Sequence, residues 1–150
     1  MPATKRVLVV DDDADIRELL VSVLSRRDLL VDQAGDGSEA LDLLRQNSYS
    51  VVLLDLLMPN VDGFGVLDEL DSAISTPVVL VITGAERSLL KQLDAQRIHG
   101  IVRKPFDAED LGNLVVACAE IKSRGTFETM AISAMIAGGP LLAWLNHFGG

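Results

Sequence analysis

The stretch VVLLDLLMPNVDG, residues 51–63, decides the fold. It begins with the apolar run Val51–Leu54, continues into one acid, Asp55, and ends in a turn that contains Pro59 and Gly63. A run that is apolar at every position is typical of a strand buried on both faces, as in a parallel sheet covered by helices. Because a charge is rarely buried without a partner, we expect Asp55 to lie where the strand leaves the sheet. In open α/β sheets, ligands bind at this edge.

The rest of the chain alternates between short apolar runs and segments with helical periodicity. Four further strands are expected at 7–10, 29–34, 77–82 and 101–103. Apolar residues recur at helical spacing within 15–27, 38–44, 63–70, 89–93 and 111–121. This alternation predicts an α/β fold, with a right-handed, mostly parallel sheet and helices on both faces. Asp13 directly precedes the first helical segment, and we expect it to cap that helix.

Composition narrows the class of protein. The chain has 150 residues, of which 49% are hydrophobic and 23% charged, as in an ordinary globular domain. Its net charge of −9 argues against general nucleic-acid binding, which needs clustered Lys and Arg. The single cysteine, Cys118, excludes an intramolecular disulfide, and the first apolar run is too short for a signal peptide. We therefore expect a cytoplasmic protein in which Cys118 is a core thiol.

Polar side chains follow four of the five predicted strands. Asp11 and Asp12 come after the first strand, Asp55 after the central one, Thr83 after the fourth and Lys104 after the fifth. In a parallel sheet these side chains gather at one edge. Clustered carboxylates repel one another, and a hard divalent cation with oxygen ligands, Mg²⁺, removes that repulsion. With Lys104 as a positive charge and Thr83 as a hydroxyl donor, the set matches a site where an aspartate accepts a phosphoryl group.

Four motifs in this order resemble the receiver domain of two-component response regulators: VLVVDDD (7–13), DLLMPNVDG (55–63), VVLVITG (78–84) and KPF (104–106). The resemblance covers residues 5–123, about four-fifths of the chain. It implies a flavodoxin-like, five-stranded parallel sheet of order 2-1-3-4-5. It also implies a phosphorelay protein whose Asp55 accepts a phosphoryl group from a sensor histidine kinase or a histidine phosphotransfer protein. Output would pass through contacts with a downstream protein target, without enzymatic turnover.

The resemblance further implies a role for each residue of the site. Asp12 would ligate Mg²⁺ directly and Asp11 through water, while Asp55 and the backbone carbonyl of Leu57 would complete the metal site. Lys104 would contact a phosphoryl oxygen and would be joined by a cis peptide to the proline that follows it, a bond type essentially confined to proline.

The switch residues depart from the family pattern. In the family, a Thr, here Thr83, turns its hydroxyl to the phosphoryl group and moves together with an aromatic residue three positions before the lysine. This chain has Ile101 at that position. An aromatic ring therefore cannot transmit the signal, and we expect a muted or altered switch. Leu57 and Ala85, which we expect to flank the site on its solvent side, are apolar and cannot orient an attacking water, so we also expect slow self-dephosphorylation.

Residues 125–150 differ in composition from the receiver domain expected over residues 1–124. They form an apolar segment whose only full charge is Glu128 and which contains the sole tryptophan, Trp144. Gly-Gly-Pro at 138–140 interrupts the apolar run and no basic flank follows it, which argues against a membrane span. Such a patch marks an interaction surface. The remaining interpretations are a helical tail for homodimerisation or docking, and the start of a truncated output domain.

Two alternative functions stay open. A Mg²⁺-dependent aspartyl-phosphate phosphatase would use the same nucleophile, but such enzymes commonly place an acid two residues after it, where this chain has Leu57. A pseudo-receiver would act as a scaffold by constitutive binding through its C-terminal tail. The complete set of acids, Thr83 and Lys104 disfavours this second alternative, whereas Ile101 and the tail keep it open.

Overall fold

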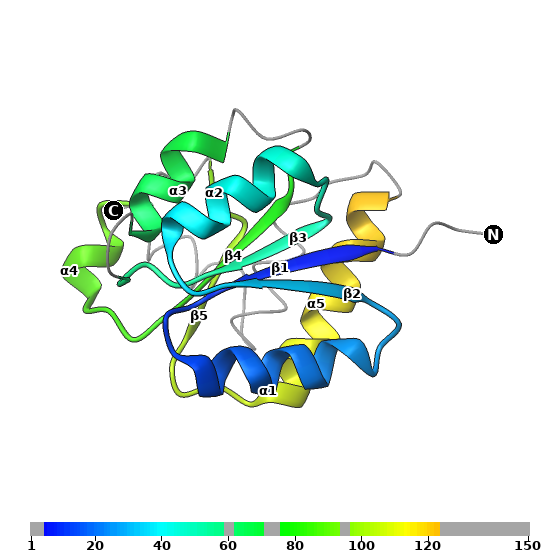
Figure 1. Ribbon diagram of the computed structural model, residues 1–150. Helices are drawn as coiled ribbons and strands as arrows, with labels where there is room; N and C mark the ends of the chain where they lie inside the picture. Colours follow the sequence, from blue (N-terminus) through cyan, green and yellow to red (C-terminus); the bar gives the residue numbers. More distant parts are fainter. Residues whose placement is uncertain (1–4, 59–61, 71–75, 94–96, 124–150) are drawn as a thin grey trace.

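The computed structural model describes residues 5–58, 62–70, 76–93 and 97–123 (Figure 1). In these residues, parallel strands form one sheet of order β2-β1-β3-β4-β5. The strands are β1 (Arg6–Val10), β2 (Leu30–Ala34), β3 (Val51–Leu54), β4 (Val78–Thr83) and β5 (Gly100–Arg103). The predicted flavodoxin-like sheet and its strand order are therefore confirmed.

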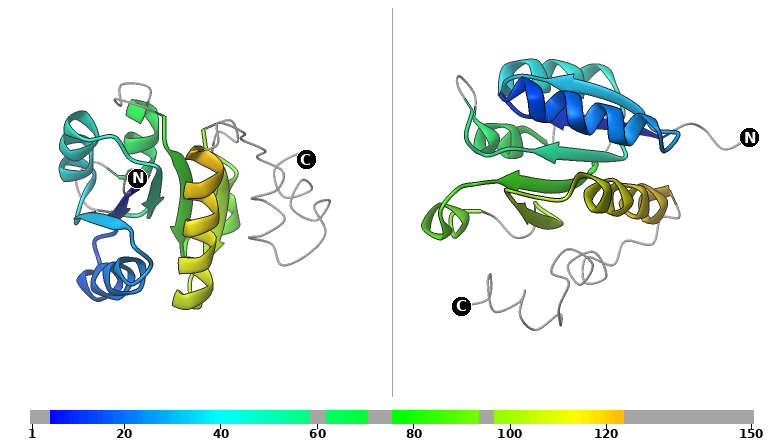
Figure 2. Two further views of the ribbon diagram at one scale, coloured as in Figure 1. Left: turned by 90° about the vertical axis from the view of Figure 1, so that its right-hand side faces the viewer. Right: turned by 90° about the horizontal axis from the view of Figure 1, so that it is seen from below.

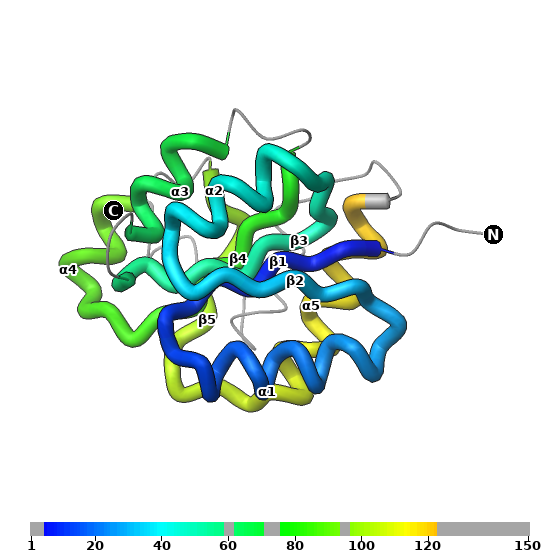
Figure 3. Tube along the Cα trace, in the orientation of Figure 1, coloured from blue at the N-terminus to red at the C-terminus, as the bar shows by residue number. Residues whose placement is uncertain are grey.

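Helices cover both faces of the sheet, as predicted. They are α1 (Ala14–Ser25), α2 (Gly37–Gln46), α3 (Gly63–Glu69), α4 (Arg87–Leu90) and α5 (Ala108–Ser123). Figures 1 and 2 show α1 and α5 on one face and α2 and α3 on the other, where α4 also contributes to the core. The chain path in Figure 3 returns to the sheet after each of the helices α1 to α4, as parallel strands require. No helix in the described part of the chain is long and apolar enough to cross a membrane.

The strands supply side chains to two hydrophobic cores, because successive residues of a strand point to opposite faces. In β3, Val52 and Leu54 belong to the core beneath α2 and α3. Val51 and Leu53 belong to the core beneath α1 and α5. These four side chains are at most 1% exposed, and burial of each stabilises the fold by about 1.5–3 kcal/mol. This is the physical reason that the run is apolar at every position.

Asp13 caps α1, as predicted. Its side chain accepts hydrogen bonds from the backbone N–H groups of Asp15 and Ile16. At the other end, α1 stops at Ser25, so two arginines that follow in sequence lie beyond the helix proper. Their guanidinium groups donate back to the Ser22 and Val23 carbonyls of α1 and also reach Glu109 of α5.

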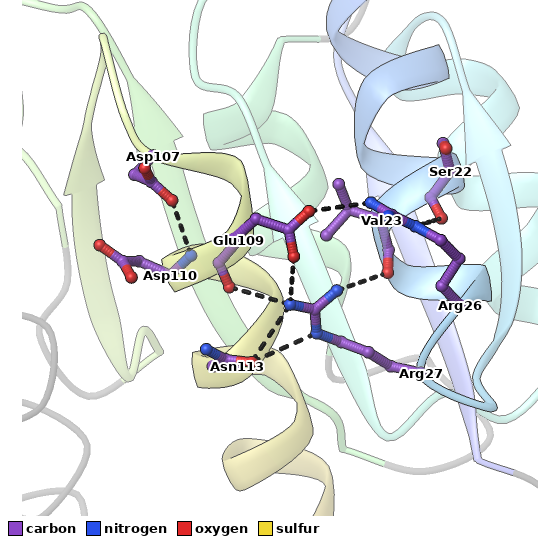
Figure 4. Close-up of polar contacts among 8 residues, drawn as sticks. All are labelled: Ser22, Val23, Arg26, Arg27, Asp107, Glu109, Asp110 and Asn113. Carbon is purple, nitrogen blue, oxygen red and sulfur yellow. Dashed lines mark hydrogen bonds and ion pairs between the residues drawn. The ribbon is translucent and has the colours of Figure 1, made fainter.

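A polar cluster joins the end of α1 to the start of α5 (Figure 4). This α1–α5 cluster consists of Arg26, Arg27, Glu109 and Asn113. Glu109 accepts from Arg26 at 2.8 Å and from Arg27 at 2.7 Å, one guanidinium on each carboxylate oxygen. Arg27 also donates to the side-chain oxygen of Asn113 at 3.2 Å. A Cβ atom at Gly112 would lie 2.8 Å from the Arg27 guanidinium carbon, so glycine lets the two helices approach closely.

Two titratable side chains serve the structure of the sheet and core. The Nδ1 atom of His99 accepts from the backbone N–H of Val79 at 2.8 Å, and the backbone N–H of His99 donates to the Val79 carbonyl. Burial, with the charge of Lys122, lowers the pKa of His99 to about 4. Cys118 is fully buried in the core beneath α5, and burial raises the pKa of its thiol to about 12. The prediction of a core thiol is thus confirmed.

Some predictions concern segments beyond the described residues. The tail at 125–150 and the turn at 59–61 are in this group. The domain boundary near residue 124 and the role of the tail therefore stay predictions.

Candidate functional site

The acids of the site are held by the sheet itself. Asp11 follows β1, and its backbone N–H donates to the Ala34 carbonyl of β2 at 3.1 Å. Asp55 follows β3, and its N–H donates to the Val10 carbonyl of β1 at 2.9 Å. The ladder of backbone hydrogen bonds thus continues one residue beyond each strand. Both acids are fixed at the carboxyl edge of the sheet, the position predicted from the sequence.

Four charged side chains meet at this edge and form the acid–lysine cluster: Asp11, Asp12, Asp55 and Lys104. The Lys104 ammonium lies 2.7 Å from a carboxylate oxygen of Asp11 and 3.1 Å from one of Asp55. One oxygen from each of the three carboxylates lies within 4.8 Å of the others. Asp11 and Asp55 are 3% and 6% exposed, whereas Asp12 is exposed. Three carboxylates therefore face one ammonium group, two of them out of water.

The pKa values reflect this crowding. Burial raises the pKa of the Asp55 carboxyl; the Lys104 ammonium opposes this shift, and the Asp11 carboxylate adds to it. Burial favours neutral Lys104, but its hydrogen bonds and ion pairs with Asp11 and Asp55 outweigh burial and raise the pKa of Lys104. Anionic Asp55 is thus held in a site that further positive charge would stabilise.

The carboxylates keep acceptor capacity for a ligand. The second oxygen of Asp11 accepts from the N–H of Asp13 at 2.9 Å, and that of Asp55 accepts from the N–H of Leu57 at 3.3 Å. Each carboxylate oxygen has two lone pairs, so single hydrogen bonds leave room for coordination. Leu57 itself has a side chain that is 54% exposed beside the acceptor.

The donor set fits Mg²⁺, which prefers carboxylate, carbonyl and water oxygens. Asp11, Asp12 and Asp55 supply oxygen atoms at one place, and exposed Asp12 keeps the cluster open to solvent. The excess negative charge of the cluster favours a divalent cation.

Two residues of the site were missed by sequence reasoning. Arg17 of α1 donates to the backbone carbonyl of Asp11 at 2.7 Å and so fixes the turn that carries the acids. Gly63, predicted only as part of the turn that ends the central stretch, allows two backbone segments to approach closely. A Cβ atom there would collide with the Asp55 carbonyl oxygen and would lie 2.6 Å from the Leu56 Cα. The sequence contains both residues but gives no signal of the contacts that they make.

Thr83 ends β4, next to β3, and is fully buried. Its hydroxyl oxygen accepts from the backbone N–H of Ala85 at 3.1 Å. Ala85 is buried, so the expectation that it flanks the site on the solvent side is wrong, whereas Leu57 is exposed there. Ile101 lies in β5, opposite Val81 of β4, and packs partly buried against the core beneath α2 and α3. The peptide between Lys104 and Pro105 is cis, as the resemblance implied.

The comparison with protein families gives a match to the response regulator receiver domain over residues 7–116. Among curated proteins, a probable transcriptional regulator, ycf27, of Guillardia theta is 33% identical over 83% of this chain and 49% of its own length. The transcriptional regulatory protein ResD of Bacillus subtilis is 35% identical over 71% of this chain and 44% of its own length. The chain thus spans about half the length of these relatives.

Solved structures show the same architecture. Response regulator protein TrrA from Thermotoga maritima, in complex with Mg²⁺ and BeF, is 30% identical, with a TM-score of 0.67 over 77% of this chain and 99% of that one. The N-terminal domain of an uncharacterized protein from Wolinella succinogenes is 29% identical, with a TM-score of 0.73 over 82% of this chain and 99% of that one. A CheY-like receiver domain protein from Methanospirillum hungatei, 18% identical, shares the fold with a TM-score of 0.70 over 82% of this chain and 99% of that one.

Proposed function

This chain belongs to the response regulator receiver domain family, and we propose that within it Asp55 is the phosphoacceptor. The observation that carries this proposal is the contact of the Lys104 ammonium with both Asp55 and Asp11 at the carboxyl edge of the sheet. This contact couples a buried carboxylate nucleophile to a positive charge that can stabilise the oxygens of an incoming phosphoryl group.

The proposed reaction moves a phosphoryl group from a partner's histidine to Asp55. A carboxylate oxygen of Asp55 forms a bond to phosphorus while the P–N bond to the imidazole breaks. The electron pair of that bond stays on the imidazole nitrogen, which can then take up a proton. Lys104 contributes by attracting a phosphoryl oxygen, and the Thr83 hydroxyl donates to another one after transfer.

Receiver domains bind Mg²⁺ at an acidic cluster. In this chain we assign the metal to Asp11, Asp12, Asp55 and the backbone carbonyl of Leu57, with Asp12 as a direct ligand and Asp11 acting through water. Bound there, Mg²⁺ neutralises charge on the phosphoryl oxygens. The exposure of Asp12 and the burial of Asp11 are compatible with these two different roles.

The proposed partners are a sensor histidine kinase or a histidine phosphotransfer protein upstream and a protein target downstream. We propose that residues 1–124 form the receiver domain. Residues 125–150 then serve as a dimerisation or docking element, or as the start of an output domain. Light scattering tests the dimer: deletion of 126–150 lowers the mass if the tail holds two copies together, and an unchanged mass contradicts that role.

A phosphatase is the weaker alternative. Leu57, two residues after Asp55, presents a half-exposed apolar side chain where a general acid would stand. The same side chain cannot orient a hydrolytic water, so the phosphorylated protein is expected to lose its phosphoryl group slowly. A half-life of seconds, followed by intact mass, would contradict this expectation.

The test of the proposed function is intact mass after incubation with Mg²⁺ and phosphoramidate, whose P–N bond imitates phosphohistidine. The parent protein gains one phosphoryl mass. The variant Asp55→Asn and a sample with chelator gain none, while Asp42→Asn, a charge-matched change at an exposed position of α2, behaves as the parent does. Absence of an adduct on the parent would overturn the phosphoacceptor proposal and favour a pseudo-receiver that binds its partner constitutively.

A further inference from the structure

The turn between β4 and α4 is held at one peptide by two side chains. Ala85 is 3% exposed, and its N–H donates to the Thr83 hydroxyl oxygen at 3.1 Å. Its carbonyl accepts from the Arg103 guanidinium at 2.8 Å. Arg103 ends β5 and lies opposite Thr83 in the register of the two strands. The polar groups of Ala85 are thus tied on one side to Thr83 and on the other to β5.

We propose that Arg103 is a positioning residue for Thr83, which controls how readily the Thr83 hydroxyl turns to a phosphoryl group on Asp55. This inference rests on the proposed function and adds to it a regulatory residue outside the phosphoacceptor, metal and lysine positions.

The reasoning follows the hydrogen bonds of the turn. When the Thr83 hydroxyl moves towards a phosphoryl oxygen, either it leaves the N–H of Ala85 or it carries the Ala85 peptide along. The first movement removes the acceptor of a buried N–H, which costs free energy. The second pulls the Ala85 carbonyl away from Arg103 and breaks a charge-assisted hydrogen bond. Through the second route, Arg103 holds the turn in its arrangement without a phosphoryl group.

Two consecutive residues at the end of β5 thus make separate contacts: Lys104 contacts the phosphoacceptor Asp55, and Arg103 contacts the turn between β4 and α4. Lys104 binds Asp55 through its ammonium, and its backbone N–H donates to the Thr83 carbonyl at 3.0 Å. Arg103 binds the turn. In a chain with Ile101 in place of an aromatic residue, a hydrogen bond from β5 supplies the connection between turn and strand that a ring cannot supply.

The experiment measures binding of the phosphoryl mimic beryllofluoride with Mg²⁺ to the full chain. Arg103→Ala is expected to bind about 3- to 10-fold more tightly than the parent, because a contact that opposes the switched arrangement is gone. Arg103→Lys, which keeps the charge but not the planar guanidinium, falls between the two. Arg87→Ala, a change of an exposed arginine on neighbouring α4, stays within about twofold of the parent. In the sample without mimic, Arg103→Ala also shifts the amide resonance of Ala85.

The outcomes separate this inference from the function on which it rests. Equal affinities of Arg103→Ala and Arg87→Ala, in a parent that binds the mimic, overturn the role of Arg103 alone. A parent that does not bind the mimic, or an Asp55→Asn variant that binds it equally well, overturns the proposed function and this inference together. Because the Arg103 side chain is exposed at an edge strand, urea denaturation is expected to show folded variants, and Arg103→Lys provides a second, milder change.

Discussion

The acid–lysine cluster and the α1–α5 cluster both consist of charged side chains in close contact, but they differ in balance and exposure. In the first, three carboxylates face one ammonium, and Asp11 and Asp55 are buried. In the second, two guanidinium groups face the single, exposed carboxylate of Glu109. The pKa of Asp55 is raised, chiefly by burial, whereas the hydrogen bond from Arg27 lowers the pKa of Glu109.

This difference separates a site from a structural contact. A cluster with excess buried charge of one sign is costly for the folded protein and gains from a cation supplied from outside. A cluster whose carboxylate is matched by guanidinium groups in water has little to gain from a ligand. Short ion pairs are present in both, so distance alone does not distinguish them.

The largest effect on the free energy of unfolding is expected at two glycines that lie against residues of the clusters. Gly63 lies against Asp55, and Gly112 lies against Arg27. In Gly63→Ala, the new methyl meets backbone atoms of Asp55 and Leu56, which cannot move aside, so the free energy of unfolding falls by about 3 kcal/mol. In Gly112→Ala, the methyl meets side-chain atoms of Val23 and Arg27, which can shift more easily than backbone, and alanine favours the helix by about 1 kcal/mol, so the net loss is about 1 kcal/mol. Urea denaturation compares the two variants. A larger loss for Gly112→Ala would contradict this assignment.

Removal of the cation from each cluster should have unequal consequences. Lys104→Ala lowers the rate of phosphoryl transfer to Asp55 about 100-fold, because a positive charge at the developing phosphoryl oxygens is lost. The same change tightens Mg²⁺ binding about tenfold, because the carboxylates lose a competing cation. Intact mass over time and calorimetric titration measure the two effects. Arg27→Ala is the matched control, and any change of Mg²⁺ affinity there would break the contrast between the clusters.

Much of this organisation was predictable from sequence, and the exceptions have a physical reason. Strand identity followed from uninterrupted apolar runs such as Val51–Leu54, because burial on both faces leaves no other pattern. The meeting of Asp11, Asp55 and Lys104 followed from parallel strand topology. The roles of residues that act on backbone atoms were not predictable. The contact of Arg103 with the Ala85 carbonyl depends on the path of a turn, which leaves no trace in residue type.

The same limit applies to the close approach at Gly63. A glycine after a turn suggests special backbone dihedrals, whereas the structure shows helix α3 starting against the Asp55 carbonyl. Basic residues at the end of a helix suit its dipole, and Arg26 and Arg27 do donate to carbonyls in the last turn of α1. Both also bind Glu109 of α5. Charge order along a helix predicts contacts with its own last carbonyls, but it gives no signal of an additional contact with a distant helix.

His99, which lies outside both clusters, also makes the free energy of unfolding depend on pH, and its contribution must be known before the clusters are compared. His99 accepts from Val79 as a neutral ring, and its pKa is lowered from 6.5 to about 4. Its stabilising contribution is therefore complete above pH 6.5 and is lost as the pH falls towards 4. We expect a loss of up to about 2 kcal/mol, reduced by partial exposure of the ring. His99→Asn, whose side-chain oxygen replaces the acceptor without titrating, should flatten unfolding free energies over this range. If the variant loses stability as steeply as the parent when the pH falls, His99 is not the source of that loss.

The smallest predicted effects are changes in the free energy of unfolding, and they should have opposite signs in the two clusters. Without Mg²⁺ at pH 7, Asp55→Asn raises the free energy of unfolding by about 1 kcal/mol, because an unfavourable buried charge is removed. Glu109→Gln lowers it, because the guanidinium groups lose their carboxylate.

As the pH falls, both differences from the parent vanish, since the parental carboxyls become neutral. The difference at Asp55 vanishes at the higher pH because the pKa of that carboxyl is raised, and the difference at Glu109 persists to lower pH because its pKa is lowered. Urea denaturation with chelator at a series of pH values measures both. Saturating Mg²⁺ should reverse the sign for Asp55→Asn and leave Glu109→Gln unchanged, whereas equal signs without Mg²⁺ would remove the distinction between a site and a structural contact.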